Sequence, residues 1–253
     1  MTVTTLTAAV SQIPQVRNAL AYQYETRRNQ IRSWIHGVSM FHLRQIDIRG
    51  ATLIPSDDIF NRLEVTTGVS IWEISTKDIE QRITHLPGVE RVRVHRRLPS
   101  TLIVSIHESP PVAYTIIDGQ QFIVTRSGHF LQSPHTHAAK SLPRMKLNSR
   151  KYNGDNADNK SLLAITQSLF LLQSSTVPWR EAILEIEPLP DHGYSIILEE
   201  PYNTKLLLPT DTKLDTLALF EVIWADFNET YGDAGRAIHA IDLRFSGQAI
   251  VRY

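Results

Sequence analysis

Few residues of this sequence have the types and the spacing that catalysis or metal binding requires. His135-Thr136-His137 sets two imidazoles at alternate positions, but the tripeptide lies in a polar stretch with no carboxylate nearby. The acidic pairs Asp57-Asp58 and Glu199-Glu200, together with Asp242, do not converge on any evident pocket. We assign these acids to helix caps, turns and solvated faces, and we predict no catalytic residue and no metal ligand.

Other motifs of enzyme chemistry are missing from the sequence as well. The 253 residues include no cysteine, which excludes disulfides, thiolate–zinc sites and a thiol nucleophile. Neither a glycine-rich phosphate loop nor a G-x-S-x-G nucleophile elbow occurs. We therefore expect no cofactor and no enzyme activity.

The charge of the chain argues against binding to nucleic acid. Lys plus Arg and Asp plus Glu both number 26, so the formal net charge is zero, whereas phosphate binding normally requires a basic excess. One local exception is the stretch 86–100, where Arg91, Arg93, His95 and Arg97 are interleaved with the apolar Val92 and Val94. This alternation predicts a half-buried strand whose basic face is either solvated or turned toward a partner. No aromatic residues interleave with the cations, which disfavours phosphate binding.

The N-terminal residues read as a separate segment. Residues 1–12 lack the basic start and apolar middle of a signal peptide, and no apolar run is long enough for a transmembrane helix. Residues 19–36 are Arg-rich with apolar residues at roughly helical spacing. Residues 1–40 are therefore either a membrane-proximal helical stalk or a mobile leader.

The region 41–116 shows the pattern strand, helix, helix, strand, strand. The first strand, 42–50, ends at Gly50, and Ser56 and Ser75-Thr76 open two helices. Two alternating strands follow, one within the stretch 86–100 around Val92 and Val94 and one at 101–107, joined by the turn Leu98-Pro99-Ser100. Because the apolar residues of all three strands share one side, we expect the helices to pack there. The apolar faces expected for the helices are Ile59, Phe60 and Leu63 in the first, and Ile79, Ile83 and Leu86 in the second.

Residues 117–253 are expected to form a second domain, because Pro110-Pro111 cannot lie inside a central strand. Residues 108–116 are read as a bridge, and residues 132–160 as a long polar loop. Strands are predicted around a Ser127-Gly128 turn and at 182–188, 193–200, 204–208, 237–245 and 248–253, with helices at 161–172 and 212–231. The residues expected to pack are Leu162, Ile165, Leu169 and Leu172 in the first helix, and Leu214, Leu217, Phe220, Ile223 and Trp224 in the second. The expected class is α+β, with a mixed, mostly antiparallel β domain that carries two helices.

These elements carry a set of short motifs that resembles the POTRA domain of the bacterial division protein family FtsQ/DivIB. An opening strand that ends in Gly50 is followed, in the family's order, by Leu86, Pro87, Val89, Val94, Arg96, Pro99, Leu102, Glu108, Pro111, Val112 and Ala113. Further on, FIVTRSGHFL (122–131), Ser141-Leu142-Pro143 and the ending IDLRFSGQAIVRY (241–253) resemble the second domain of the family. Thr125, Leu98 and Leu208-Pro209 depart from the family pattern.

The resemblance implies a non-enzymatic scaffold of the divisome on the outer face of the cytoplasmic membrane, at the division septum. The POTRA domain would recruit the protein to other divisome components. Its motif residues would either stabilise the fold or take part in this recruitment. The second domain would bind FtsB/FtsL-like division proteins. Members of the family carry a transmembrane helix before the POTRA domain. Because no apolar run of this sequence is long enough for one, membrane association is expected through a segment absent from this chain.

The final strands are the expected partner-binding site, because a terminal strand at a sheet edge can accept an extended segment of another protein. Arg244 would pair with a partner carboxylate, and Phe245 and Tyr253 would act as aromatic anchors. The predicted partner-binding residues are Arg244, Phe245, Gln248, Ala249, Ile250, Val251, Arg252 and Tyr253.

Two alternatives remain open at this point. A POTRA domain also precedes outer-membrane barrels in secretion and assembly proteins, but residues 114–253 have too few strands for a barrel. A cell-wall enzyme would need a polar cleft with perturbed carboxylates, and the sequence nominates none.

Overall fold

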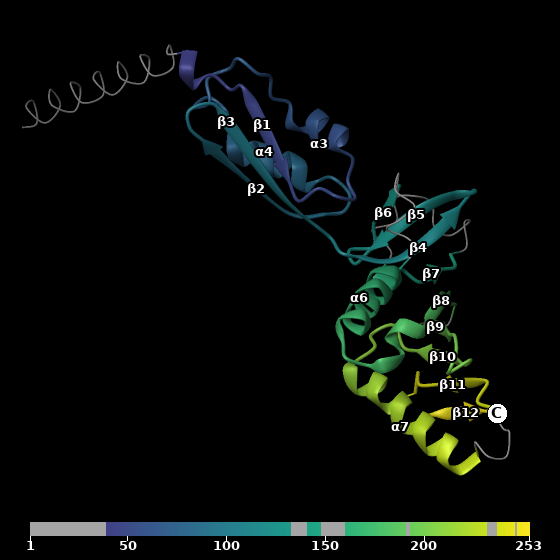
Figure 1. Cartoon of the computed structure of the whole chain (residues 1–253). Coiled ribbons are helices and arrows are strands. Elements are labelled where there is room, and N and C mark those ends of the chain that lie inside the picture. Colours follow the sequence, from purple (N-terminus) through teal and green to yellow (C-terminus); the bar gives the residue numbers. More distant parts are fainter. Residues whose placement is uncertain (1–38, 133–140, 148–159, 191–192, 232–236, 246) are drawn as a thin grey trace, which may run out of the picture. The chain divides into compact units, whose positions relative to one another are not determined.

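A computed structural model describes residues 39–132, 141–147, 160–190, 193–231, 237–245 and 247–253 (Figure 1). The predicted helix at 19–36, His135-Thr136-His137 and most of the predicted loop 132–160 lie outside these residues. The chain divides into two compact units, one of residues 1–49, 60–83 and 92–105 and another of residues 50–59, 84–91 and 106–253. The predicted domain boundary at residue 116 stays a prediction.

The first sheet has three strands: β1 (Gln45–Arg49), β2 (Val89–Arg97) and β3 (Thr101–Glu108). They lie in the order β1-β3-β2, and β1 runs parallel to β3. A short 3-10 turn, η1 (Ser39–Phe41), precedes β1, and the helices α3 (Ser56–Leu63) and α4 (Thr76–Thr84) lie between β1 and β2. The predicted β-α-α-β-β order is confirmed.

Alternation along β2 produces the two faces of this sheet. Val92 and Val94 are buried, whereas Arg91, Arg93, His95 and Arg97 are exposed. The predicted apolar faces of the two helices are only partly confirmed. Phe60 of α3 is 48% exposed, and Leu86 lies beyond the end of α4. The buried side chains of the region include Ile59, Leu63, Ile79, Ile83, Leu102, Val104 and Ile106.

The second sheet has nine strands in the order β12-β11-β10-β9-β8-β7-β4-β5-β6. Its pairs β4–β7, β7–β8 and β10–β11 are parallel and the other neighbours are antiparallel, which confirms the mixed, mostly antiparallel prediction. The strands are β4 (Pro111–Ile117), β5 (Gln120–Thr125), β6 (Phe130–Gln132), β7 (Arg144–Met145), β8 (Ile183–Leu189), β9 (Gly193–Leu198), β10 (Lys205–Leu208), β11 (Ala240–Asp242) and β12 (Ile250–Arg252).

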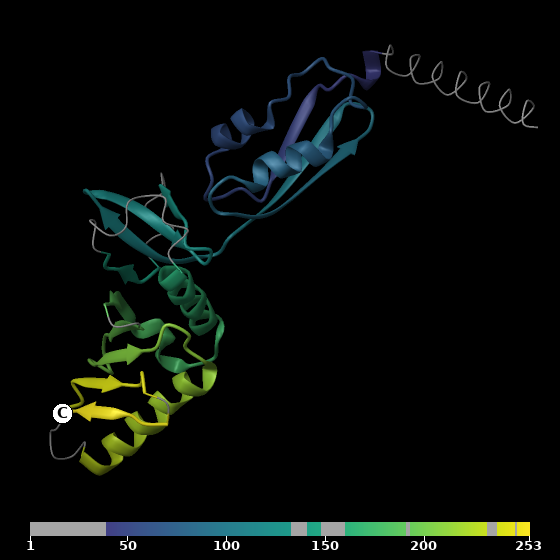
Figure 2. The same cartoon turned by 180° about the vertical axis from the view of Figure 1, so that it is seen from behind.

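Two helices pack on one side of the nine-stranded sheet, as Figures 1 and 2 show from opposite directions. These are α6 (Lys160–Ser174) and α7 (Leu214–Tyr231), and the 3-10 turn η2 (Pro178–Ala182) follows α6. Their apolar residues join those of the strands in one core, in which Trp179 packs edge-on against Phe220 with ring centroids 5.2 Å apart. None of the helices that the structure describes is long and apolar enough to cross a membrane.

Several details of the second region correct the sequence-based predictions. Residues 111–117 form β4 instead of a bridge, and Pro111 is tolerated because it is the first residue of the strand. The predicted loop 132–160 contains the short strand β7, whose Met145 is fully buried. Leu214, predicted to pack, is 52% exposed at the start of α7. The last two strands are also shorter than predicted, with three residues each.

Candidate functional site

The last strand of the chain lies at an edge of the nine-stranded sheet. β12 pairs with β11, with Ile250 opposite Asp242 and Arg252 opposite Ala240. Among the strands that the structure describes, β11 is its only neighbour. A strand in this position offers backbone N–H and C=O groups along its outer side to another extended chain. The prediction that a terminal strand forms a sheet edge is confirmed.

An aromatic cluster lies beside this edge. Tyr253 stacks on Tyr231 with ring centroids 6.3 Å apart and contacts Phe227 at 5.7 Å. Phe227 is buried at the end of α7, while Tyr231 and Tyr253 are 40% and 65% exposed. The C-terminal residue is therefore held against α7 and still presents most of its surface to solvent.

The predicted partner-binding residues separate into two groups. Phe245, Gln248, Ile250 and Arg252 are exposed, with Phe245 at 50% and Ile250 at 46%. Ala249 and Val251 are half-buried and pack against the core. The alternation along β12 thus turns Ile250 and Arg252 away from the core and uses Val251 to fix the strand.

Arg244 is bound within its own chain. Its Nε donates to Asp242 Oδ1 at 2.9 Å, its Nη2 donates to Asp242 Oδ2 at 2.7 Å, and its backbone N–H also donates to Oδ1 at 3.1 Å. These bonds and the nearby Arg252 charge hold the pKa of Asp242 below its usual range, although burial acts against this shift. Asp242 is only 6% exposed, so its interpretation as a solvated or turn residue is wrong.

Gly193 makes room for this ion pair. A Cβ atom built on Gly193 would lie 2.6 Å from the Leu208 backbone oxygen and 3.2 Å from Arg244 Cδ. The absence of a side chain at the start of β9 therefore lets the Arg244 stem lie close to the sheet. Sequence reasoning missed Gly193 and Asp242, although the Asp-x-Arg spacing of IDLR is a signal for a pair on one side of an extended chain.

The family-motif residues of the first region mostly hold the fold. The Glu108 carboxylate accepts the backbone N–H groups of Thr52, Leu53 and Ile54 at 2.8–3.0 Å and the Thr52 hydroxyl at 2.6 Å. Gly50 has a φ of +79°, and a Cβ atom there would lie 2.2 Å from the Ile106 backbone oxygen. Both residues therefore shape the segment between β1 and α3.

Arg96 and Val94 have comparable roles at β2. The Arg96 guanidinium donates to the backbone oxygens of Ile71 at 2.8 Å and Ile74 at 2.6 Å. The Val94 N–H donates to the Glu80 carboxylate at 2.7 Å. Of the other motif residues, Pro87 and Pro99 are exposed, and Val89 and Pro111 are half-buried at the first positions of β2 and β4.

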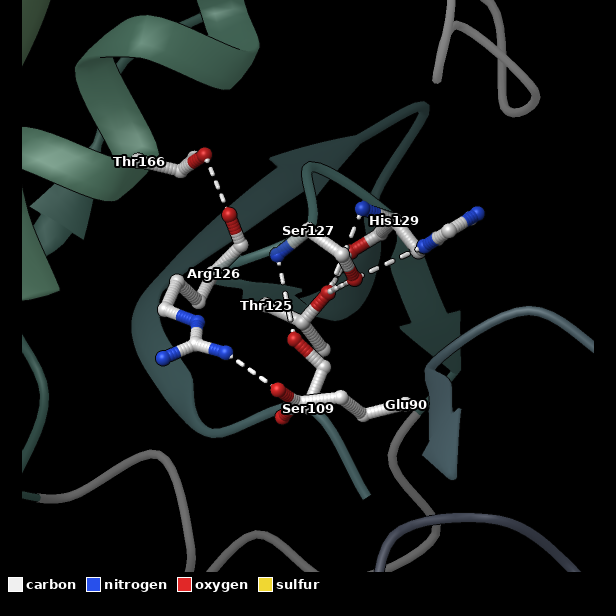
Figure 3. A network of polar contacts seen from close by, with 7 residues as sticks. All are labelled: Glu90, Ser109, Thr125, Arg126, Ser127, His129 and Thr166. Atoms are coloured by element: carbon white, nitrogen blue, oxygen red, sulfur yellow. Dashed lines mark hydrogen bonds and ion pairs between the residues drawn. The ribbon is translucent and has the colours of Figure 1, made fainter. Parts of the chain in front are cut away.

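A second polar cluster surrounds the turn between β5 and β6 (Figure 3). Ser127 Oγ lies 2.9 Å from His129 Nδ1 and 3.0 Å from Thr125 Oγ1, and the Ser127 N–H donates to Ser109 Oγ at 3.0 Å. Thr125 Oγ1 also accepts the His129 N–H at 3.2 Å, so this side chain forms a hydrogen bond across the turn. These contacts close the hairpin, and sequence reasoning missed them despite the alternating Thr125, Ser127 and His129.

Arg126 anchors the same turn. Its guanidinium pairs with Glu90 and lies 4.7 Å from the centre of the Phe170 ring, and its backbone oxygen accepts the Thr166 hydroxyl at 2.9 Å. The Glu90 pair and the Thr166 bond are drawn in Figure 3. In the part of the chain that the structure describes, no group of three His, Cys, Asp or Glu side chains is placed to hold a metal ion.

Comparison with known proteins agrees with these structural features. Residues 41–109 match the family model described as "POTRA domain, FtsQ-type". The chain is 27% identical over 110 residues to the cell division protein DivIB of Clostridium botulinum (strain Hall), covering 44% of this chain and 41% of that protein. It is 28% identical over 89 residues to the cell division protein FtsQ of Rickettsia bellii, covering 35% of this chain and 33% of that protein.

A solved structure of the major extracytoplasmic domain of DivIB from Geobacillus stearothermophilus is 16% identical, with a TM-score of 0.32, and covers 48% of this chain and 96% of that chain. The matched segments span less than half the length of the curated relatives given above. The family match and the observed β-α-α-β-β order confirm the resemblance to FtsQ/DivIB and the α+β class. Residues 41–109 are thus similar to a POTRA domain of the FtsQ type.

Proposed function

We propose that this protein is a non-enzymatic scaffold of the divisome that binds FtsB/FtsL-like division proteins on the outer face of the cytoplasmic membrane at the septum. Its relatives are cell division proteins of the FtsQ/DivIB family, which supports a role in division. The POTRA domain would contact other divisome components.

The observation that carries this proposal is the outer edge of β12, along which no other described strand pairs. An extended partner segment can continue the nine-stranded sheet there by backbone hydrogen bonds, which supply affinity without demanding a particular sequence. β12 has only three residues, so the bonds along it would be few. Side chains around the edge must therefore supply much of the affinity and most of the specificity.

The exposed side chains at this edge suit that purpose. Phe245 and Tyr253 are large, half-exposed or more, and close to the strand, as interface anchors usually are. Ile250 and Arg252 would flank an added strand on the face that does not pack against the core. A partner carboxylate that approached Arg244 would share its guanidinium with Asp242, so we expect Arg244 chiefly to position this edge.

Titration calorimetry with the periplasmic part of the host's FtsB-like protein tests the proposal. Ile250→Glu and Tyr253→Ala should each weaken binding by roughly tenfold or more, because anchor residues commonly contribute at least that much. Leu184→Glu is the matched control, since Leu184 is 54% exposed on β8, in the interior of the same sheet. Circular dichroism would confirm that all variants fold.

The intact protein should bind and the control should keep its affinity. An equal loss in the Leu184→Glu control would contradict a site at β12. Absence of binding by the intact, folded protein would contradict the proposed partner. Truncation after Phe245 would remove β12 and keep β11, and should abolish binding.

A further inference from the structure

The end of the three-stranded sheet where β2 meets β3 carries exposed apolar side chains that the proposed function does not use. Met40 in η1 is 50% exposed, Trp72 is 40% exposed, and Leu98 in the β2–β3 turn is 51% exposed. Figure 1 shows η1 and the β2–β3 turn at the same end of this sheet. We call Met40, Trp72 and Leu98 the apolar tip.

Backbone contacts hold the three segments of the apolar tip together. The Arg44 N–H donates to the Ser100 oxygen at 2.9 Å, which joins the start of β1 to the β2–β3 turn. The Ile71 N–H donates to the Phe41 oxygen at 2.8 Å, and the Phe41 and Trp72 rings lie 6.2 Å apart. The Arg96 guanidinium holds the oxygen atoms of Ile71 and Ile74. Hydrogen bonds therefore fix the backbone that carries these exposed side chains.

Cations lie next to the apolar tip. Arg97 directly precedes Leu98. Arg93 lies four residues earlier in β2 and is exposed like Arg97. The side chain of Arg93 makes no hydrogen bond or ion pair with the residues that the structure describes. The nearby carboxylate of Asp47 is bound by Arg49 at 2.6 Å, although it also feels the charge of Arg97. This face of β2 therefore retains uncompensated positive charge.

The backbone of β2 is poorly placed to bind a peptide by strand addition. β2 is an edge strand, but its Val94 N–H is already bound by the Glu80 carboxylate at 2.7 Å. Charged side chains line the strand on its exposed face, which further opposes pairing with another chain. Any ligand of this surface must therefore be recognised by side chains.

We propose that the apolar tip and the adjacent arginines rest on the surface of an anionic phospholipid bilayer. Tryptophan is favoured at the membrane–water interface, where its ring meets both apolar and polar groups, and Leu and Met side chains gain from leaving water. Guanidinium groups bind headgroup phosphates and are attracted to an anionic surface. The inference rests on the proposed function, which sets this protein beside a membrane, and adds a direct lipid contact.

Vesicle co-sedimentation of the purified full chain tests this inference. We expect binding to vesicles of phosphatidylcholine with phosphatidylglycerol, and much weaker binding to phosphatidylcholine alone. Two double variants, Arg93→Gln/Arg97→Gln and Trp72→Ser/Leu98→Ser, should each weaken binding by about an order of magnitude, since each arginine contributes roughly fivefold near such a surface. Quenching of tryptophan fluorescence by brominated lipid should fall in the Trp72→Phe variant.

Matched controls are available elsewhere in the chain. Arg144→Gln/Lys213→Gln removes the same charge, and Leu184→Ser/Leu214→Ser removes two similarly exposed leucines. Both controls should bind as the unaltered chain does. Equal losses in variants and controls, or binding that does not depend on anionic lipid, would overturn the inference. The partner affinity of the tip variants should be unchanged, so failure here is distinguishable from failure of the proposed scaffold function.

Discussion

The molecule contains nearly the same tetrapeptide twice, and the two copies behave differently. Ile46–Arg49 reads IDIR in β1, and Ile241–Arg244 reads IDLR at the end of β11. Arg49 directs both Nε and Nη2 to a single oxygen of Asp47, whereas Arg244 uses both oxygens of Asp242 in a fork. The side chains of Asp47 and Arg49 are 31% and 56% exposed, against 9% and 23% for Asp242 and Arg244.

The difference shows that surroundings, more than sequence spacing, decide what an Asp-x-Arg pair does. An exposed pair in water contributes little to stability, because solvent and salt screen it. A pair that is largely withdrawn from water must stay intact, since either partner alone would leave a poorly solvated charge. We therefore expect the pair in β1 to be dispensable and the pair beside β12 to be structural.

Substitution of the residue that follows the first tetrapeptide is expected to change the free energy of unfolding most. Gly50 follows IDIR with a φ of +79° and no space for a Cβ atom beside the Ile106 oxygen. Gly50→Ala should lower the free energy of unfolding by about 3 kcal/mol or more, through both backbone strain and displacement of β3. Urea denaturation followed by circular dichroism would measure this.

Gly119→Ala is the matched control for that prediction. Gly119 has the same φ of +79°, but a Cβ atom there meets nothing within 4 Å. Its substitution should cost only the strain of the left-handed conformation, about 1 kcal/mol. Equal losses for the two variants would mean that the Ile106 oxygen does not matter.

A carboxylate next to Gly50 gives the second prediction. Glu108→Ala would leave the N–H groups of Thr52, Leu53 and Ile54 without their shared acceptor. The free energy of unfolding should fall by about 2–3 kcal/mol, because charge-assisted hydrogen bonds to backbone are among the stronger ones. Glu181→Ala, at a side chain that is 82% exposed, should change it by less than about 0.5 kcal/mol. Thermal unfolding of both variants would check this difference.

Sequence reasoning predicted well wherever one period governed a whole element. The alternation along β2 and the stripe of Leu162, Ile165, Leu169 and Leu172 in α6 correctly separated buried from exposed side chains. Prediction failed where the helical period alone could not tell whether other elements pack over a side chain. Phe60 and Leu214 fit the helical period, but their side chains are 48% and 52% exposed.

The candidate site was predictable in its place but not in its contacts. The sequence predicted that the final strands could lie at a sheet edge, and β12 lies at an edge of the nine-stranded sheet. The bond between Arg244 and Asp242 forms where the Arg244 stem passes Gly193 of β9, at which a Cβ atom would lie 3.2 Å from Arg244 Cδ. A contact of this kind depends on the packed sheet, so the linear sequence only hints at it.

The Arg244 pair provides the third prediction. Arg244→Gln should lower the free energy of unfolding by about 1–2 kcal/mol, because Asp242 would remain largely buried without a compensating charge. Arg49→Gln, at the equivalent position of the exposed tetrapeptide, should leave stability unchanged within error. A double-mutant cycle with Asp242→Asn would isolate the coupling between the two side chains. Zero coupling would contradict a structural role for the pair.

Acid titration gives the smallest expected effect and distinguishes the two carboxylates. The pKa of Asp242 lies below its ordinary value of 3.8, first because of the hydrogen bond from Arg244. Since the folded state holds the charged form more tightly, this stabilisation is present above pH 3.8 and is lost as the pH falls through the lowered folded value. The free energy of unfolding of the Asp242→Asn variant should therefore depend less steeply on pH below about 4 than that of the unaltered chain.

The pKa of Asp47 is lowered in the same direction by Arg49, but in an exposed pair. Asp47→Asn should consequently leave the acid limb of the stability curve almost unaltered, because screening by water and salt reduces the effect of that pair. Free energies of unfolding from urea titrations between pH 2 and 6 would compare the three proteins. If Asp47→Asn flattened the acid limb as much as Asp242→Asn, burial would not be what separates the two tetrapeptides.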